Sequence, residues 1–262
     1  MEDLYIIKIG GETLGNPTEL SDCLEVLAKI DKKVILVHGG GRKVSDLATQ
    51  LGIPQQLVEG RRITTKETLE LCTMVYAGLI NKNLVAKLSS FGQLALGLSG
   101  ADLQCIQAKK RVHPTIDYGQ VGEVRDVDEN LFIEWIVKGI LPVVSSITLG
   151  EEYELLNTNA DTLALEIALS LISEYKVHLV YCFGKKGVLQ DVSDENSLLE
   201  EISHQKFLEL KTLGQVSDGM IPKLHTAYRG LYHGVEEARI LHSSQLGNYF
   251  LGAEPGTHLK LH

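Results

Sequence analysis

Two apolar runs in the sequence are each followed by glycines. Lys8 lies near the end of the first run, just before Gly10 and Gly11, and residues 39–41 after the second run are all glycine. A lysine at the end of a buried strand loses hydration unless an anion replaces the water. Glycine backbone N–H groups and the start of a following helix also attract anions. The segments therefore predict an anion site, although an edge-strand lysine and tight glycine turns would show the same sequence.

The glycine segments match neither common nucleotide-binding fingerprint. The chain has no Gly-x-x-x-x-Gly-Lys-Ser/Thr sequence, and Val44 stands where the third glycine of a dinucleotide site belongs. An NAD-dependent oxidoreductase is therefore disfavoured. His38, directly before the glycines, is interpreted as a hydrogen-bonded structural residue rather than a catalytic base.

Two arginines could supply a carboxylate-binding group. Arg61 and Arg62 precede a helix whose cap is expected to be Thr64 or Thr65. A guanidinium binds a carboxylate through two parallel hydrogen bonds. One of the two arginines is nevertheless expected to lie at the surface.

Amide and acidic side chains follow in a later segment. Asn159 is a candidate helix cap, with Asp161 in the first turn and Asn157 just ahead. An aspartate in a first turn commonly balances the helix dipole, but the flanking asparagines also favour a functional role. Lys223, in a helix that opens after a glycine loop, gains meaning as a second cation if it meets Lys8.

The elements that would position these residues alternate along the chain. Continuous apolar runs predict strands at 4–9, 34–37, 94–98, 140–144 and 177–181. Helical periodicity predicts helices at 20–29, 43–51, 66–79, 82–91, 131–138, 160–171, 205–213 and 220–232. This order predicts an α/β fold, a three-layer αβα sandwich with a mainly parallel central sheet. Residues 101–127 are expected to form a small antiparallel hairpin over the main sheet.

Composition limits the kinds of partner. The 262 residues include 44% hydrophobic and 23% charged side chains, and 25 basic against 34 acidic residues give a net charge of −9. Any anion site must therefore be a local cluster of positive charge, and neither nucleic acid nor a membrane is an expected partner.

The start of the sequence, its apolar runs and its cysteines indicate where the protein is located. The sequence starts without a secretion signal, no apolar run reaches the ~18 residues of a membrane span, and the four cysteines form no Cys-x-x-Cys pair. We expect a cytoplasmic protein with reduced cysteines and no protein-bound metal.

The ordered segments resemble those of the amino acid kinase family, and within it the branch that phosphorylates N-acetylglutamate. They are Lys8-Ile9-Gly10-Gly11, His38-Gly39-Gly40-Gly41, Gly60-Arg61-Arg62-Ile63-Thr64, Asn157-Thr158-Asn159-Ala160-Asp161 and Ser217-Asp218-Gly219-Met220-x-x-Lys223. The resemblance spans essentially the whole chain, 1–262, as a single domain. It implies an acyl-amino-acid lobe at about 1–150 and an ATP lobe at about 151–262.

The resemblance implies phosphoryl transfer from ATP, with Mg²⁺ bound to the nucleotide, to the side-chain carboxylate of N-acetyl-L-glutamate in arginine biosynthesis. The implied catalytic residues are Lys8, Lys223 and Asp161, the last holding the two lysines. The implied substrate-binding residues are Gly40, Gly41, Arg62 and Asn157. The implied ATP-binding residues are Gly10, Gly11, Gly187, Ser217, Asp218, Gly219 and Met220, and Gly40 would also donate to phosphate.

The chain departs from the family pattern in two places. Residues 182–187 lack the acidic residue that usually helps to bind the nucleotide, so Lys185 or Lys186 is a candidate phosphate ligand instead. The chain also starts at its first strand, without the leading helix of the arginine-inhibited hexameric members. The resemblance therefore implies an arginine-insensitive homodimer, with the helices at 66–91 as a candidate interface.

Three alternatives stay open at this stage. A succinyl group could replace acetyl if the basic residues 109–111 cover the amino acid. Other family members phosphorylate aspartate, free glutamate, carbamate or uridine monophosphate. A sensor that binds nucleotide or amino acid without turnover would keep the glycine loops, but retention of Lys8, Lys223 and Asp161 together disfavours it.

Overall fold

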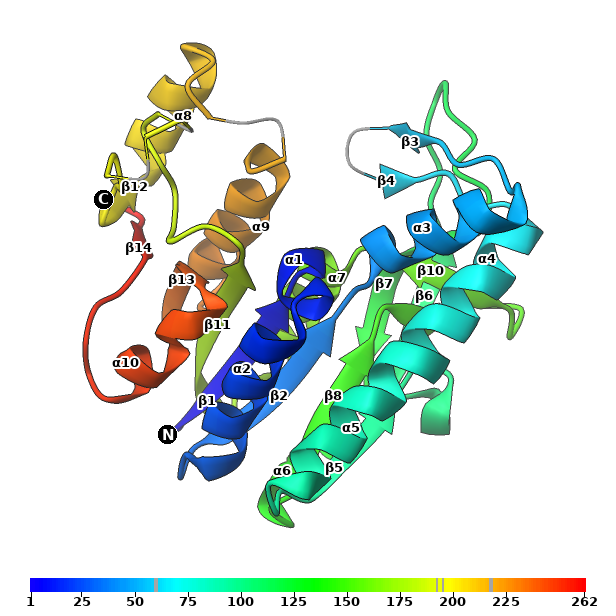
Figure 1. Ribbon diagram of the computed structural model, residues 1–262, viewed down its shortest axis with the longest axis horizontal. Helices are drawn as coiled ribbons and strands as arrows, with labels where there is room; N and C mark the ends of the chain where they lie inside the picture. Colours follow the sequence, from blue (N-terminus) through cyan, green and yellow to red (C-terminus); the bar gives the residue numbers. More distant parts are fainter. Residues whose placement is uncertain (59–60, 192, 195, 217–218) are drawn as a thin grey trace.

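The computed structural model describes residues 1–58, 61–191, 193–194, 196–216 and 219–262. Within these residues the main sheet has eight strands in the order β12-β14-β13-β11-β1-β2-β8-β5 (Figure 1). In chain order these are β1 (Glu2–Ile9), β2 (Lys33–His38), β5 (Ala95–Leu98), β8 (Leu141–Ser145), β11 (Tyr175–Phe183), β12 (Glu201–Ser203), β13 (Glu237–His242) and β14 (Thr257–Lys260). Neighbouring strands are parallel except β13 and β14.

The order of the strands creates a switch point in the middle of the sheet. From β1 the chain continues to β2 on one side, and from β11, the other neighbour of β1, it continues to β13. Ligands of open α/β sheets bind outside the carboxyl ends of the strands at such a point. Lys8 and Gly10 lie at this edge.

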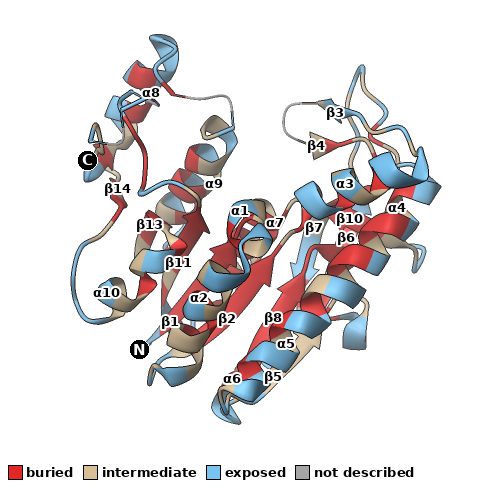
Figure 2. Cartoon of the chain, in the orientation of Figure 1, coloured by how far each residue is buried: buried red, intermediate tan, exposed pale blue. Residues whose placement is uncertain are grey.

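Helices cover both faces of the sheet, which confirms the predicted three-layer fold. One apolar core joins Leu4 and Ile6 of β1 to the helices behind the sheet in Figure 1, and another joins Ile7 and Ile9 to those in front. The central strands are buried almost throughout (Figure 2). The helices behind are α6 (Glu129–Val137), α7 (Ala160–Leu171), α8 (His204–Thr212) and α9 (Ile221–Tyr232), and those in front are α2 (Pro17–Lys29), α5 (Asn81–Ser90) and α10 (Leu246–Phe250).

The other α-helices and strands lie around the carboxyl edge of the sheet. They are α1 (Gly11–Gly15), α3 (Gly41–Leu51), β3 (Leu57–Val58), β4 (Arg61–Arg62), α4 (Lys66–Thr73), β6 (Ile106–Lys110), β7 (Val121–Val127), β9 (Ile147–Leu149) and β10 (Leu155–Thr158). The predicted hairpin exists as the antiparallel pair β6 and β7. It is part of a small closed barrel with β9 and β10, rather than a hairpin laid on the main sheet.

The two helices predicted at 66–79 and 82–91 are one continuous helical stretch. A π-helical segment, Met74–Ile80, joins α4 to α5, and Met74, Ile80 and Asn81 all have right-handed helical backbone angles. The prediction of a break was wrong because the junction contains no proline, and Gly78, within the π-helical turns, does not end the helix.

Candidate active site

Lys8 lies at the carboxyl end of a central strand. β1 is paired on both sides, so Lys8 is not an edge-strand lysine. Alternation along the strand places it on the same face as Leu4 and Ile6, toward α7. Its Nζ lies 2.6 Å from Oδ1 of Asp161, and the two residues are 7% and 8% exposed. The buried ammonium is therefore compensated by a carboxylate.

The start of α7 positions Asp161. Oδ1 of Asn159 accepts hydrogen bonds from the backbone N–H groups of Asp161 and Thr162, both at 3.0 Å, so Asn159 is the cap that the sequence predicted. The hydroxyl of Tyr181 on β11 donates to the backbone oxygen of Asp161 at 3.1 Å. These contacts fix the first turn of α7 against the sheet.

Lys223 reaches the same carboxylate from α9. Its Nζ is 3.3 Å from Oδ2 of Asp161 and 5.5 Å from the ring centre of Phe183. It also donates to the backbone oxygen of Gly219 at 3.3 Å. Two ammonium groups from distant parts of the chain thus meet at one carboxylate.

The electrostatics of the trio favour an anionic ligand. Burial by itself raises the pKa of the Asp161 carboxyl, but the charges of Lys8 and Lys223 outweigh burial and lower that pKa to about 2. Asp161 is therefore ionised at neutral pH. One negative and two positive charges leave a local positive excess in a chain whose net charge is −9. This is the local cluster of cations that the composition required.

Glycines surround the trio. α3 starts directly after Gly40, and the first N–H groups of a helix have no partner within it. Gly40 has φ +154°, and a Cβ there would lie 2.4 Å from Cδ1 of Ile80, so no larger residue fits. The N–H of Gly10 donates to the backbone oxygen of Cys182 at 3.1 Å, so Gly10 shapes its loop with that N–H rather than offering it to a ligand.

A cavity of about 190 Å³ joins these groups. The predicted residues that line it are Lys8, Gly10, Gly11, Gly40, Gly41, Arg62, Asn157 and Asp161. Lys8 and Asp161, two glycine loops, a guanidinium and an amide therefore share one space, whereas Lys223 contacts Asp161 without lining the cavity.

Arg62 is held in place at the far side of this cavity. Its Nη2 donates to the backbone oxygen of Gly41 and to Oγ of Ser45, both at 2.8 Å, and its Nη1 donates to Gln55. Arg62 is 7% exposed. Arg61 is more exposed than Arg62, as expected for one of the two arginines, and it also lines the cavity.

Asn157 is linked to the same region. Its Nδ2 donates to Oγ1 of Thr64 at 3.0 Å, and that hydroxyl donates to the backbone oxygen of Arg62 at 2.9 Å. Of the two candidate caps of α4, Thr65 is the one used, because its hydroxyl accepts the N–H of Thr68 at 3.2 Å. Thr64 instead connects the amide to the arginine strand.

Some predicted residues lie elsewhere. Gly187 is buried, and a Cβ there would lie 2.6 Å from Oγ1 of Thr257; its predicted ATP role stays a prediction. Gly219 is exposed, and Met220 packs partly against the core behind the sheet. Gly60, Ser217 and Asp218 of the sequence segments lie outside the described residues.

The loop after β11 forms a separate cavity. Lys185 and Lys186 line a space of about 230 Å³ together with His242. The side chain of Cys182 belongs to the core in front of the sheet. A phosphate role for either lysine stays a prediction.

Sequence reasoning assigned no role to several residues that line the cavity. Tyr76, Ser146 and Thr158 all line it. Tyr76 is on the apolar face of a predicted helix, where an aromatic ring is interpreted as core. Ser146 follows a short strand, and nothing in its spacing marks it. Thr158 lies between Asn157 and Asn159 in the recognised segment, but no role was assigned to it.

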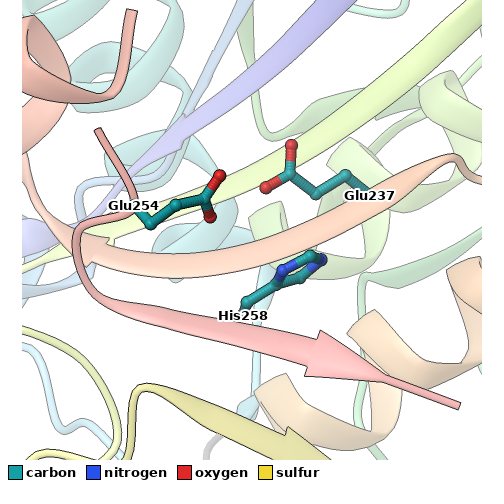
Figure 3. Close-up of side chains that lie close together, drawn as sticks. All are labelled: Glu237, Glu254 and His258. Carbon is teal, nitrogen blue, oxygen red and sulfur yellow. The ribbon is translucent and has the colours of Figure 1, made fainter. Parts of the chain in front are cut away.

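A second cluster of titratable groups lies at the opposite edge of the sheet. Figure 3 shows the carboxylates of Glu237 and Glu254 facing each other beside the ring of His258, and their possible ligand atoms lie within 4.8 Å of one another. Arg239, 1% exposed, already forms ion pairs with both glutamates. The buried guanidinium explains this cluster without a metal ion.

Comparisons with known proteins agree with this geometry. The sequence profile described as the Amino acid kinase family matches residues 3–242. The chain is 44% identical to an acetylglutamate kinase of Bacteroides fragilis over 245 residues, which cover 94% of each chain. It is also 44% identical to an acetylglutamate kinase of Azobacteroides pseudotrichonymphae over 262 residues, the whole of both chains.

Solved structures show the same fold. The crystal structure of smu.665 from Streptococcus mutans UA159 superposes with a TM-score of 0.84 at 25% identity and covers 100% of both chains. No helix among the described residues is long and apolar enough to cross a bilayer. The matched profile and the identity over nearly the full length lead to one conclusion: the chain belongs to the amino acid kinase family.

Proposed function

We propose that this chain transfers the terminal phosphoryl group of ATP to the side-chain carboxylate of N-acetyl-L-glutamate, a step of arginine biosynthesis. The relatives that match it over nearly its whole length are named acetylglutamate kinases. The structural observation that supports the proposal is the meeting of Lys8 and Lys223 at Asp161, beside a cavity that also contains a fixed guanidinium and an amide.

The chemistry of this reaction suits the groups present. A carboxylate acceptor with a pKa of about 4 is already ionised at neutral pH, so the reaction needs no general base. Phosphoryl transfer depends mainly on positioning and on stabilising charge on the phosphoryl oxygens. Lys8 and Lys223 supply positive charge, and Asp161 holds both of their ammonium groups at fixed places.

The far side of the cavity is assigned to the amino acid. Arg62 binds its carboxylate, because the guanidinium is anchored through Gly41 and Ser45 and still borders the cavity. Asn157 binds the amide end, and Gly40 and Gly41 contact the acyl-amino acid. Gly11 and residues 217–220 are assigned to the phosphates of ATP.

The donor set fits magnesium that arrives on the nucleotide. The carboxylate of Asp161 is already shared by two ammonium groups, which leaves it a poor ligand for a further cation. Mg²⁺ bound to ATP would supply charge neutralisation on the phosphates, and the protein residues bind and orient the complex.

Acetyl is favoured over succinyl as the acyl group. Two of the three basic residues that could recognise a second carboxylate are already paired: Lys110 lies 3.6 Å from Glu154, and Arg111 pairs with Glu123. A succinyl substrate would have to break these contacts.

We also propose a homodimer in the cytoplasm. Of the apolar residues in the candidate interface, Leu71 and Leu84 are each 1% exposed and belong to the core. Met74 and Leu79 of the π-helical segment are 59% and 48% exposed, and these two support an interface. Sedimentation with and without arginine tests the assembly, and a hexamer would contradict it.

One coupled assay tests the proposed function. ADP release is followed with acetylglutamate, succinylglutamate or free glutamate as the acceptor. We expect release that depends on acetylglutamate and is at least tenfold faster than with the other two. Tight binding of nucleotide or amino acid without ADP release would instead identify a sensor.

A further inference from the structure

A buried polar pair lies directly behind the glycine loop of the cavity. His38 at the end of β2 and Asn81 at the start of α5 are both 0% exposed. Nδ2 of Asn81 lies 3.1 Å from Nε2 of His38, and Nδ1 of His38 lies 2.9 Å from the backbone oxygen of Gly39. Neither residue lines the cavity.

The contacts fix which nitrogen of His38 has the proton. Nδ2 of Asn81 also donates to the backbone oxygen of Val143 at 2.9 Å, and a carbonyl oxygen only accepts, so the orientation of the Asn81 amide is determined. Its second hydrogen then points to Nε2 of His38, which must accept. Nδ1 therefore has the proton, and this N–H donates a hydrogen bond to the backbone oxygen of Gly39. Burial lowers the pKa of His38 to about 4, so the ring stays neutral at neutral pH.

This arrangement has a cost that packing does not explain. Oδ1 of Asn81 is buried and has no hydrogen-bond partner in the described part of the chain. It also excludes any side chain at residue 97, where a Cβ on Gly97 would lie 2.1 Å from Oδ1. An unpaired buried oxygen is destabilising, so a purely structural position would favour an apolar residue.

The hydrogen bond to Gly39 sets the direction of the next N–H. The peptide between Gly39 and Gly40 is planar and trans, so its C=O and N–H point in opposite directions. With the oxygen held by the buried ring of His38, the N–H of Gly40 points away from that ring, and Gly40 itself lines the cavity. Ile80 and the ring of Tyr76 pack against Gly40 and restrict its movement.

We propose that His38 and Asn81 are positioning residues that hold the Gly39–Gly40 peptide so that the N–H of Gly40 donates to the transferring phosphoryl group. The proposal rests on the proposed function. α5 takes part because Asn81 directly follows the π-helical segment, and this segment also provides Tyr76 and Ile80. One helical stretch thus supports the loop through two kinds of contact.

The test compares a histidine of the pair with one outside it. His38→Leu removes the donor to Gly39, and His38→Asn keeps an N–H close to the position of Nδ1. His178→Leu is the control, because His178 pairs with Asp3 and Glu237 at the other edge of the same sheet. Asn81→Leu removes the amide N–H that is donated to Nε2 of His38. It is the second variant if His38→Leu does not fold.

We expect kcat to fall about 10- to 100-fold in His38→Leu, less than the ~10²–10³ of deleting a donor outright, with KM for ATP changed less than about threefold. His38→Asn should recover part of this loss: the decrease in log kcat should be at least one third smaller than in His38→Leu. His178→Leu should lower the melting temperature without lowering kcat. Normal kcat in folded His38→Leu, or losses that follow melting temperature equally in both leucine variants, would overturn the proposal.

A spectroscopic readout separates this proposal from the proposed function. In ¹⁵N-glycine-labelled protein, the amide resonance of Gly40 is followed while AMP-PNP and magnesium are added. We expect a shift in the wild type that is lost in His38→Leu, whichever acceptor the enzyme uses. Failure to turn over acetylglutamate would overturn only the proposed function, whereas an unchanged shift in His38→Leu would overturn the positioning role.

Discussion

Replacing Asp161 by asparagine removes the carboxylate that Lys8 and Lys223 share. The pKa of this group falls from 3.8 to about 2 in the folded chain. At about 1.4 kcal/mol per pKa unit, the ionised carboxylate contributes about 2–3 kcal/mol to folding at neutral pH. We expect Asp161→Asn to lose stability of this size, and kcat to fall about 10²- to 10³-fold because the ammonium groups lose their common anchor.

The pH dependence of stability has a defined sign. Because the folded-state pKa of Asp161 lies below the unfolded-state value, its stabilisation is complete above about pH 4 and is lost as pH falls toward about 2. The difference in unfolding free energy between wild type and Asp161→Asn should therefore shrink over that range. Urea denaturation at several pH values measures this difference directly.

A matched control exists on the same two helices. Glu166 of α7 pairs with Arg229 of α9 at a partly exposed position. Exposed pairs are typically worth less than about 1 kcal/mol, so Glu166→Gln should change stability slightly and leave kcat unchanged. If Asp161→Asn behaved like Glu166→Gln in both stability and kcat, the account of the charge trio would be refuted.

Three further predictions follow from single positions. Gly40→Ala should abolish most activity and destabilise the fold by about 1–3 kcal/mol, because its Cβ would lie 2.4 Å from Ile80. Measurements of kcat and a melting curve test this prediction, and a neutral effect would contradict the close packing. Arg62→Ala should raise KM for acetylglutamate at least tenfold with a smaller change in kcat, as steady-state kinetics will show; an unchanged KM would exclude the assigned contact. Burial lowers the pKa of His178, but Glu237 and Asp3 outweigh burial and raise that pKa above its usual value. The stabilisation of the fold by protonated His178 is therefore complete below about pH 6.5 and is lost as pH rises through the folded-state pKa. His178→Leu should flatten this decline in thermal melts, and an equally steep decline would contradict the pairing.

The regular part of the fold was predictable from the sequence. Parallel strands buried on both faces are continuous apolar runs, and α7 begins and ends at the residues that its cap and periodicity indicated. Strand β13 was missed because Glu237 and Arg239 interrupt its apolar pattern. Arg239 is buried only because Glu237 and Glu254 compensate its charge, and such pairing between distant residues does not show in local sequence.

Only those site residues whose type is unusual for their place in the sequence could be predicted. Lys8 was recognisable as a costly charge in an apolar strand, and Asp161 as a first-turn acid. Tyr76 and Asn81 were not, because their roles depend on the π-helical turns that rotate this stretch toward the glycine loop. Periodicity cannot reveal a π-helical turn, so tertiary geometry was needed to find them.

The central claim is that the ammonium of Lys8 stabilises charge during phosphoryl transfer to acetylglutamate. The most direct measurement is kcat of Lys8→Met with saturating ATP and acetylglutamate, after circular dichroism has shown the variant to be folded. We predict a decrease of about 10²- to 10³-fold. A folded Lys8→Met enzyme with near-normal kcat would contradict the claim.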